Sequence, residues 1–206
     1  MTSIQMRENP LFMRTTGRET GRWGIPQIMK SEFPLGNIEL IAWSDTRSND
    51  TLNRKKGVHF FVDDYRFESV YRWPERSLKK LAQYRFVLTP DYSLYADMPV
   101  WRQIESIGKS RWCGVWWQEQ GLTVIPTVSW SNLPSYAYCF DGIEVGSTVA
   151  VGMIGCKHSK RAFLHGYDAM LEQLKPEMVI CFGIPFNEMR GNVIPVDYMA
   201  SRKGVR

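Results

Sequence analysis

The sequence predicts an α/β fold with a mostly parallel sheet of about six or seven strands. One observation is a series of short runs rich in β-branched and aromatic residues, six clear and a seventh weaker, at residues 37–43, 57–62, 85–88, 122–128, 147–154, 178–182 and 193–196. A second is that segments of helical periodicity separate several of these runs, as in β-α-β units. A third is that Asp, Ser or Gly follows most runs. Such strands form either an incomplete (β/α) barrel or an open doubly wound sheet.

Three helices are expected between the strands. Pro74 begins the first and Pro99 begins the second, because proline is favoured in the first helical turn. Gly121 ends the second, since glycine is common just after a helix. The third covers residues 159–174. These positions predict helices that pack on the sheet and connect parallel strands.

The chain is expected to form one α/β domain over residues 37–200. A length of 206 residues suits one domain with a full hydrophobic core. Residues 1–36 are irregular, and we expect an arm that packs on the domain, because Trp23 and Ile25 are too apolar for a solvated tail. Residues 201–206 form a basic tail.

Composition narrows the class of protein. Apolar residues make up 44% and charged residues 23%, which excludes global disorder. The longest apolar runs are too short to span a bilayer, and the first residues lack the apolar core of a signal peptide, so we expect a cytoplasmic protein with no membrane partner. The four cysteines form no CxxC pair, which argues against a zinc site and for reduced thiols. A net charge of +5 permits nucleic acid or phosphate ligands without requiring them, and the oligomeric state stays open.

Side-chain alternation along the strands predicts which face meets the helices. In the run at 57–62, Val58 and Phe60 share a wholly apolar face, which should meet the helices, and His59 and Phe61 share a mixed face, which should point inward. The same reasoning places two residues of the run at 85–88 against the helices, Phe86 and Leu88, and three others inward, Val87, Thr89 and Asp91.

The inward residues become polar toward the carboxyl end of each strand. Ligand sites of α/β folds lie at this edge. We therefore expect a shared pocket there, formed by the polar residues that follow the first four strands: Asp45, Asp63 or Asp64, Asp91 and Ser129. Thr127, inside the fourth run, shares the face of Ser129 and is a further candidate ligand-binding residue.

The acidic residues of this set could bind a divalent cation. Hard cations take carboxylate oxygens and retain water, and Asp63, Asp64 and Asp91 are the candidate ligands. The same three residues could instead act as acid or base groups, with His59 as an assisting base or ligand. The alternative is that the aspartates cap turns and helices and that His59 is a hydrogen-bonded core residue.

A basic segment follows the fifth strand and opens the third helix. Lys157, Ser159, Lys160 and Arg161 lie at a helix N-terminus, where free amides and cations suit a phosphate group. A thiol in this setting, Cys156, would have a lowered pKa. The alternative is a solvated basic loop. The chain has no GxGxxG motif and no P-loop, so the usual nucleotide fingerprints are missing.

An aromatic segment forms a third candidate. Arg111, Trp117 and Gln118, together with Trp130, could offer a surface on which bases stack. The alternative is that the segment is a helix packed on the sheet, with its tryptophans buried.

Four motifs in order resemble a known family. They are HFFVDDYRFE at 59–68, PDYSLY at 90–95, IPTVSWS at 125–131 and CFDGI at 139–143. In this combination, over residues 23–185, the chain resembles the domain of unknown function 4417 family. The resemblance implies a bacteriophage or mobile-element protein that acts in the host cytoplasm. It brings no established activity and no agreed catalytic residues.

Three hypotheses of function follow. The leading one is binding or processing of a phosphate-bearing ligand, a nucleotide or nucleic acid, at the carboxyl ends of the strands. The second is a non-enzymatic protein that binds a host macromolecule. The third is a nucleic-acid-binding protein without catalysis, whose affinity would fall steeply with salt.

Overall fold

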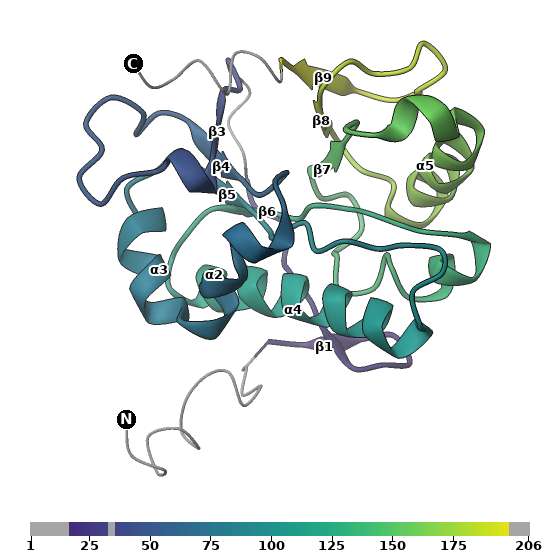
Figure 1. Cartoon of the computed structure of the whole chain (residues 1–206), viewed down its shortest axis with the longest axis horizontal. Coiled ribbons are helices and arrows are strands. Elements are labelled where there is room, and N and C mark those ends of the chain that lie inside the picture. Colours follow the sequence, from purple (N-terminus) through teal and green to yellow (C-terminus); the bar gives the residue numbers. More distant parts are fainter. Residues whose placement is uncertain (1–16, 33–35, 198–206) are drawn as a thin grey trace.

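The computed structural model describes residues 17–32 and 36–197 (Figure 1). Its parallel strands form two sheets, ordered β3-β4-β5-β6 and β7-β8-β9. Their bounds are β3 Leu40–Ala42, β4 Gly57–His59, β5 Phe86–Leu88, β6 Val124–Ile125, β7 Val149–Gly152, β8 Val179–Phe182 and β9 Val193–Val196. Every pairing inside these two sheets is parallel, which confirms the predicted α/β class and strand direction.

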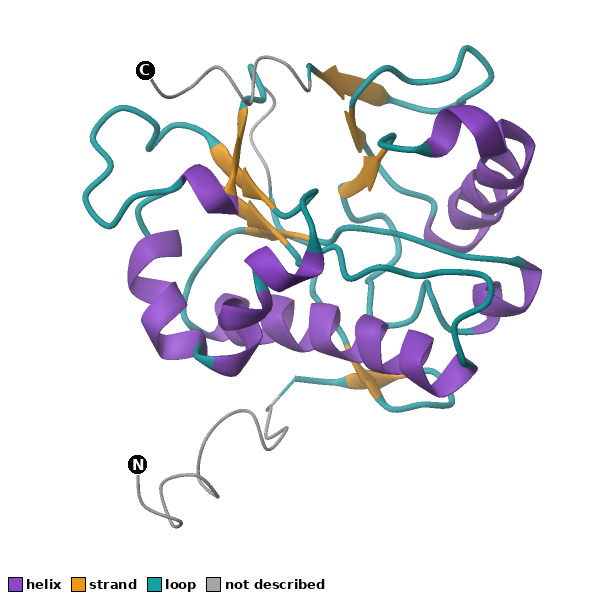
Figure 2. Ribbon diagram, viewed as in Figure 1, coloured by secondary structure: helices purple, strands orange, loops and turns teal. Residues whose placement is uncertain are grey.

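The strands are divided between two sheets rather than gathered in one. Within residues 17–32 and 36–197, the sheets meet at a single parallel bridge, Thr127 to Ala150. There the amide of Val128 donates to the Ala150 carbonyl at 2.8 Å, and the amide of Ala150 donates to the Pro126 carbonyl at 2.9 Å. The carbonyl of Pro126 faces the second sheet, and because Pro126 has no N–H it donates no ladder bond to that sheet. Because the bridge is parallel, the carboxyl ends of both sheets lie on the same side of the molecule (Figure 2).

Helices cover the outer faces of both sheets. The helix bounds are α2 Glu68–Arg72, α3 Pro74–Leu81, α4 Val100–Glu119 and α5 Lys160–Leu174. The first three pack beside β3–β6 and α5 packs beside β7–β9 (Figures 1 and 2). The predicted starts at Pro74 and Pro99 are confirmed, and Gly121 follows α4 with a φ of +82°. The sequence did not predict α2, because five residues are too few to show a helical period.

A third apolar cluster lies between the two sheets. Leu40, Phe86, Leu88 and Ile125 come from the first sheet, and they pack with Ile180 of the second. The placement of β4 agrees with the alternation, since Val58 and Phe60 belong to the cluster under the helices.

The predicted facing of β5 is wrong. Phe86 and Leu88 lie between the sheets, whereas Val87 packs with the helices. A strand that is apolar on both faces carries no signal of which face is which. The polar residues used to orient it, Thr89 and Asp91, lie beyond Leu88, where the strand has ended.

The N-terminal segment packs on the domain where it is described. Two short antiparallel strands, β1 Glu19–Thr20 and β2 Ile25–Pro26, precede a buried Ile28 that bridges to Ile143. Residues 1–16 and 33–35 of the predicted arm, and the predicted basic tail, lie outside the described residues. Over the part that is described, no helix combines the length and apolar character needed to cross a membrane.

Candidate functional site

A pocket of about 700 Å³ opens at the carboxyl ends of the strands. The last residues of four strands line it, Ala42 of β3, His59 of β4, Gly152 of β7 and Phe182 of β8. Both sheets therefore contribute to the same cavity. This is the edge at which α/β proteins place ligand sites.

Four residues predicted from the sequence line this pocket together. They follow the four strands of the first sheet: Asp45 after β3, Asp63 after β4, Asp91 after β5 and Ser129 after β6. Carboxylates far apart in the sequence lie together here because the carboxyl ends of successive parallel strands lie at the same edge of the sheet. Asp91 lines the pocket although the facing of β5 was misassigned, because it lies three residues beyond the end of that strand.

Asp91 is a pocket carboxyl group whose pKa is strongly raised by this setting. Burial, and then the negative charge of Asp64, raise its pKa to about 7. A hydrogen bond from Ser129 and the charge of Arg111 act in the opposite direction and are outweighed. A carboxyl group with a pKa near 7 exchanges its proton readily at neutral pH, which is the property expected of an acid–base group in a ligand site.

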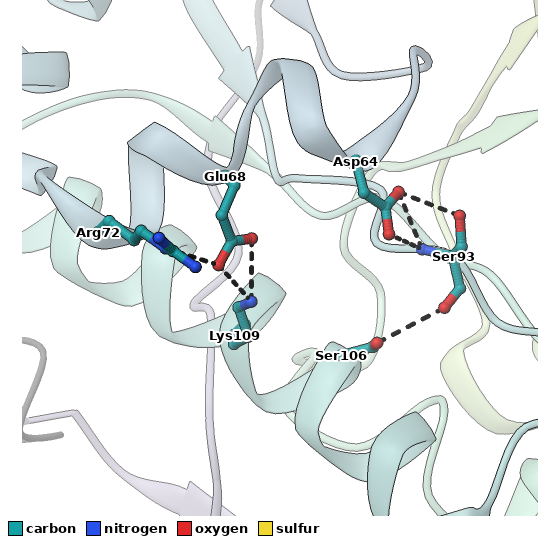
Figure 3. Close-up of polar contacts among 6 residues, drawn as sticks. All are labelled: Asp64, Glu68, Arg72, Ser93, Ser106 and Lys109. Atoms are coloured by element: carbon teal, nitrogen blue, oxygen red, sulfur yellow. Dashed lines mark hydrogen bonds and ion pairs between the residues drawn. The ribbon is translucent and has the colours of Figure 1, made fainter.

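Asp64 stands behind the pocket rather than in it. Its carboxylate accepts hydrogen bonds from the Ser93 amide at 3.2 Å and the Ser93 hydroxyl at 3.0 Å (Figure 3). The Ser93 carbonyl in turn accepts from the Ser106 hydroxyl of α4 at 3.5 Å. Ser93 lines the pocket, so Asp64 fixes one wall of it and acts on Asp91 through its charge.

A partly buried ion pair anchors the segment that carries Asp64. Lys109 of α4 donates to both carboxylate oxygens of Glu68 at 2.8 and 3.0 Å, and Arg72 lies 3.5 Å from the same carboxylate (Figure 3). The Lys109 ammonium also lies 4.4 Å from the ring centre of Tyr92. Glu68 opens α2, directly after the turn at Asp64, so the pair sets the position of that turn against α4.

The exposed rim of the pocket carries one cation among its lining residues. Arg66 lies 3.6 Å from Asp63, and both side chains are largely exposed. The Arg66 Nε also donates to the Tyr65 hydroxyl at 3.2 Å. The sequence analysis did not predict Arg66 as a pocket residue. The only sequence feature that indicates it is its position three residues after Asp63, in a tight turn.

His59 forms part of the pocket floor. It is 2% exposed, and burial lowers its pKa to about 3, so the ring is neutral at physiological pH. Its Nδ1 accepts the Phe61 amide at 3.2 Å, while its Nε2 has no hydrogen-bond partner among the described residues. A ring with this pKa is a weak base, so the assisting-base role predicted for His59 has little chemical support.

The predicted metal ligands are not assembled into one cluster. Asp64 is turned to Ser93 and does not line the pocket, and Asp63 pairs with Arg66 at the rim. Across residues 17–32 and 36–197, no group of three or more His, Cys, Asp and Glu side chains is arranged to hold a metal ion.

The region that forms this pocket matches a family model. The model, described as Domain of unknown function (DUF4417), covers residues 18–199. The chain belongs to this family. It is 37% identical over 177 residues to the Gene 1 protein of Mycobacterium phage L5, covering 84% of this chain and 76% of that one. It is 36% identical to the Gene 1 protein of Mycobacterium phage D29, covering 84% of this chain and 65%, just under two thirds, of that one. No solved structure matches the chain.

Arg111 has a structural role in this DUF4417 protein. It is 1% exposed and donates to three backbone carbonyls, those of Thr127 at 2.9 Å, Cys139 at 3.0 Å and Asp141 at 3.1 Å. Burial lowers its pKa to about 10, which leaves it charged. Arg111 thus ties two loops to α4 and does not line the pocket, contrary to the ligand-binding role predicted for it.

The other aromatic and amide candidates also lie in packed positions. Trp117 is fully buried against Phe60, at 5.7 Å between ring centres, and Trp130 packs on Phe163 at 5.1 Å. Gln118 exchanges two hydrogen bonds with the Met29 backbone, at 2.8 and 2.9 Å. None of them lines the pocket, and Trp117 is buried, as the alternative of a helix packed on the sheet expects.

Thr127 is a strand-pairing residue. It is 3% exposed, and its hydroxyl donates to the Thr89 carbonyl at 2.7 Å. The Thr89 hydroxyl accepts the Thr127 amide at 2.9 Å. The reciprocal bonds continue the pairing of the chains beyond β5 and β6, and they leave Thr127 outside the pocket lining.

The basic segment lies close to the pocket mouth. Ile154 lines the pocket, and three peptide units place the Cα of Lys157 at most about 11 Å away. Lys157 and Arg161 are exposed, whereas Lys160 pairs with Glu188 at 2.7 Å. Ser159 makes no side-chain cap.

The expected activation of Cys156 is wrong. Burial, and then the charge of Asp91, raise the pKa of its thiol, although Lys157 follows it directly. The thiol sulfur lies 3.7 Å from the Gly152 carbonyl, on the wall beside the pocket. Lys157 and Arg161 are exposed and Lys160 pairs with Glu188, and these charges do not offset the burial.

Proposed function

We propose that this protein binds a small phosphate-bearing ligand, of about nucleotide size, in the pocket at the carboxyl ends of its strands. The observation that carries the proposal is the meeting of Asp45, Asp63, Asp91 and Ser129 in one cavity. Its volume of about 700 Å³ lies within the range of small-molecule sites. Asp91, with a pKa near 7, is the group best placed to exchange a proton with the ligand.

The charges of the pocket assign an orientation to this ligand. Three carboxyl groups line the cavity, so a phosphate at its floor would be repelled. The cations stand outside: Arg66 at the rim, and Lys157 and Arg161 on the segment that follows Ile154. A ligand would therefore enter with its hydroxyl or N–H donors toward the carboxylates and its phosphate toward the rim.

A thermal-shift titration with nucleoside monophosphates, inorganic phosphate and Mg²⁺ tests this proposal. A ligand at a hundred times its Kd stabilises the fold by about 2.7 kcal/mol, which raises the Tm of a chain of this size by roughly 5–10 °C. Asp91→Asn is expected to abolish most of the shift.

Matched charge variants separate a specific phosphate contact from general charge effects. Lys157→Ala with Arg161→Ala is expected to weaken binding, while Lys79→Ala with Arg76→Ala, two exposed cations of α3, leaves it unchanged. The proposal fails if no nucleotide or phosphate stabilises the protein, or if the Asp91→Asn protein binds as the unchanged protein does.

A further inference from the structure

The pocket floor carries a buried donor that the fold itself leaves unused. His59 is 2% exposed and its ring lines the pocket, yet Nε2 has no hydrogen-bond partner among the described residues. A buried polar atom without a partner costs about 1–3 kcal/mol. Such an atom calls for an explanation, and a ligand in the adjoining cavity supplies one.

Backbone geometry fixes which nitrogen of His59 carries the proton. The Phe61 amide donates to Nδ1 at 3.2 Å, so Nδ1 is an acceptor and the neutral ring holds its hydrogen on Nε2. Burial keeps the ring neutral by lowering its pKa. His59, a residue of the pocket lining, therefore carries one uncharged N–H donor that no described residue accepts.

The surroundings of this donor favour a flat, neutral partner. The His59 ring packs against Phe182 at 4.3 Å and Phe61 at 5.7 Å between ring centres, and both phenylalanines line the pocket. A phosphate oxygen is a poor partner here, because it would bury a negative charge with no cation beside it. An ammonium group is excluded because it cannot accept a hydrogen bond. A carbonyl oxygen or an unprotonated ring nitrogen meets both conditions.

We infer that the Nε2–H of His59 binds an acceptor atom of a planar, nucleobase-like ring, while Asp91 meets an N–H donor of the same ring. This inference rests on the proposed function and specifies the end of the ligand opposite its phosphate. A ring edge that carries an acceptor beside a donor is characteristic of nucleobases, which show this pattern for pairing. His59 is then a specificity-determining residue rather than a base.

Two substitutions of His59 separate binding from folding. Asn places its carbonyl where Nδ1 stands, so His59→Asn keeps the acceptor for the Phe61 amide and removes the donor to the pocket. Gln reaches the position of Nε2, so His59→Gln keeps that donor and loses the acceptor. The nucleoside monophosphate that binds best is titrated against each variant, with ribose 5-phosphate as a probe that lacks the ring.

The inference predicts that His59→Asn weakens nucleotide binding about tenfold and leaves ribose 5-phosphate binding unchanged. His59→Gln keeps nucleotide affinity within about threefold while its Tm falls. If nucleotides bind the His59→Asn protein with full affinity but bind Asp91→Asn weakly, the role of His59 is wrong and the pocket proposal stands. If neither probe binds the unchanged protein, both are wrong.

Nitrogen NMR of the three histidines adds a measurement on the unchanged protein, which still applies if both variants unfold. The ring of His59 should carry its proton on Nε2 and stay neutral from pH 8 to pH 5, while His158 and His165, which are exposed, serve as references. Addition of the nucleotide should shift the Nε2–H resonance. A proton on Nδ1, or a resonance that nucleotide binding leaves in place, overturns the inference.

Discussion

Replacing Asp91 by Asn should change how the stability of the protein depends on pH. The carboxyl group ionises near pH 7 in the folded chain and near its ordinary value of 3.8 in the unfolded chain. Between these values the folded state keeps a proton that the unfolded state has lost, so the free energy of unfolding falls as pH rises. This group's contribution is fully present below about pH 4 and is lost as pH rises through about 7.

The size of the effect follows from the two pKa values. Each pH unit between them corresponds to about 1.4 kcal/mol, which sets an upper limit of about 4 kcal/mol. Asp91 is partly exposed to the pocket, and solvent reduces this to about 2–4 kcal/mol. Asn has nearly the same shape and no charge, so Asp91→Asn should be more stable than the unchanged protein above pH 7 and lose that advantage near pH 4.

Urea denaturation from pH 4.5 to pH 8.5 measures this difference. Comparing the two proteins at each pH cancels the other titrating groups, including His59, whose lowered pKa acts in the opposite direction. Asp63→Asn is the control, because Asp63 lines the same pocket but is largely exposed. A difference between Asp91→Asn and the unchanged protein that stays constant across this range would refute the reasoning.

Three further substitutions test other parts of the structure. Arg111→Met should lower the free energy of unfolding by about 3–5 kcal/mol in urea denaturation, because three buried carbonyls lose their donor; an effect below 1 kcal/mol would contradict it. Asp64→Asn removes a like charge and should lower the pKa of Asp91 in a carboxyl NMR titration, and an unchanged pKa would show that Asp64 has no influence. Gly152→Ala places a Cβ 2.9 Å from the Phe61 ring, so it should lower the free energy of unfolding by about 1–3 kcal/mol and weaken ligand binding. Normal stability and affinity would show that the Phe61 side chain moves aside without cost.

The sequence alone predicted the position of the pocket better than it predicted the chemistry of the pocket. Strand-length runs followed by Asp45, Asp63 and Ser129 placed polar residues at strand ends, and parallel pairing brings such ends together. That step needs only the period of a strand and the order of the elements. Prolines at the starts of α3 and α4 were informative for the same reason, because their effect is local.

Contacts between distant segments escaped prediction. Arg111 was predicted to belong to a base-stacking segment, and only the fold shows that it donates to three backbone carbonyls. Asp63 and Asp64 are adjacent in sequence, yet Asp63 lines the pocket and Asp64 bonds to Ser93, 29 residues further along the chain, because a tight turn begins between them. The division into two sheets depends on where the hydrogen bonds between neighbouring strands end. The alternation of side chains along a strand does not indicate these positions.

Methyl NMR of the protein with an added nucleoside monophosphate tests the location of the binding site most directly. Ile154, Val62 and Leu94 line the pocket, while Ile28 and Ile107 are buried elsewhere. Binding at the carboxyl ends of the strands predicts that the first three methyl signals shift with one saturating curve and that the last two stay in place. Shifts confined to methyl groups away from the pocket, or none at saturating nucleotide, would contradict a ligand site there.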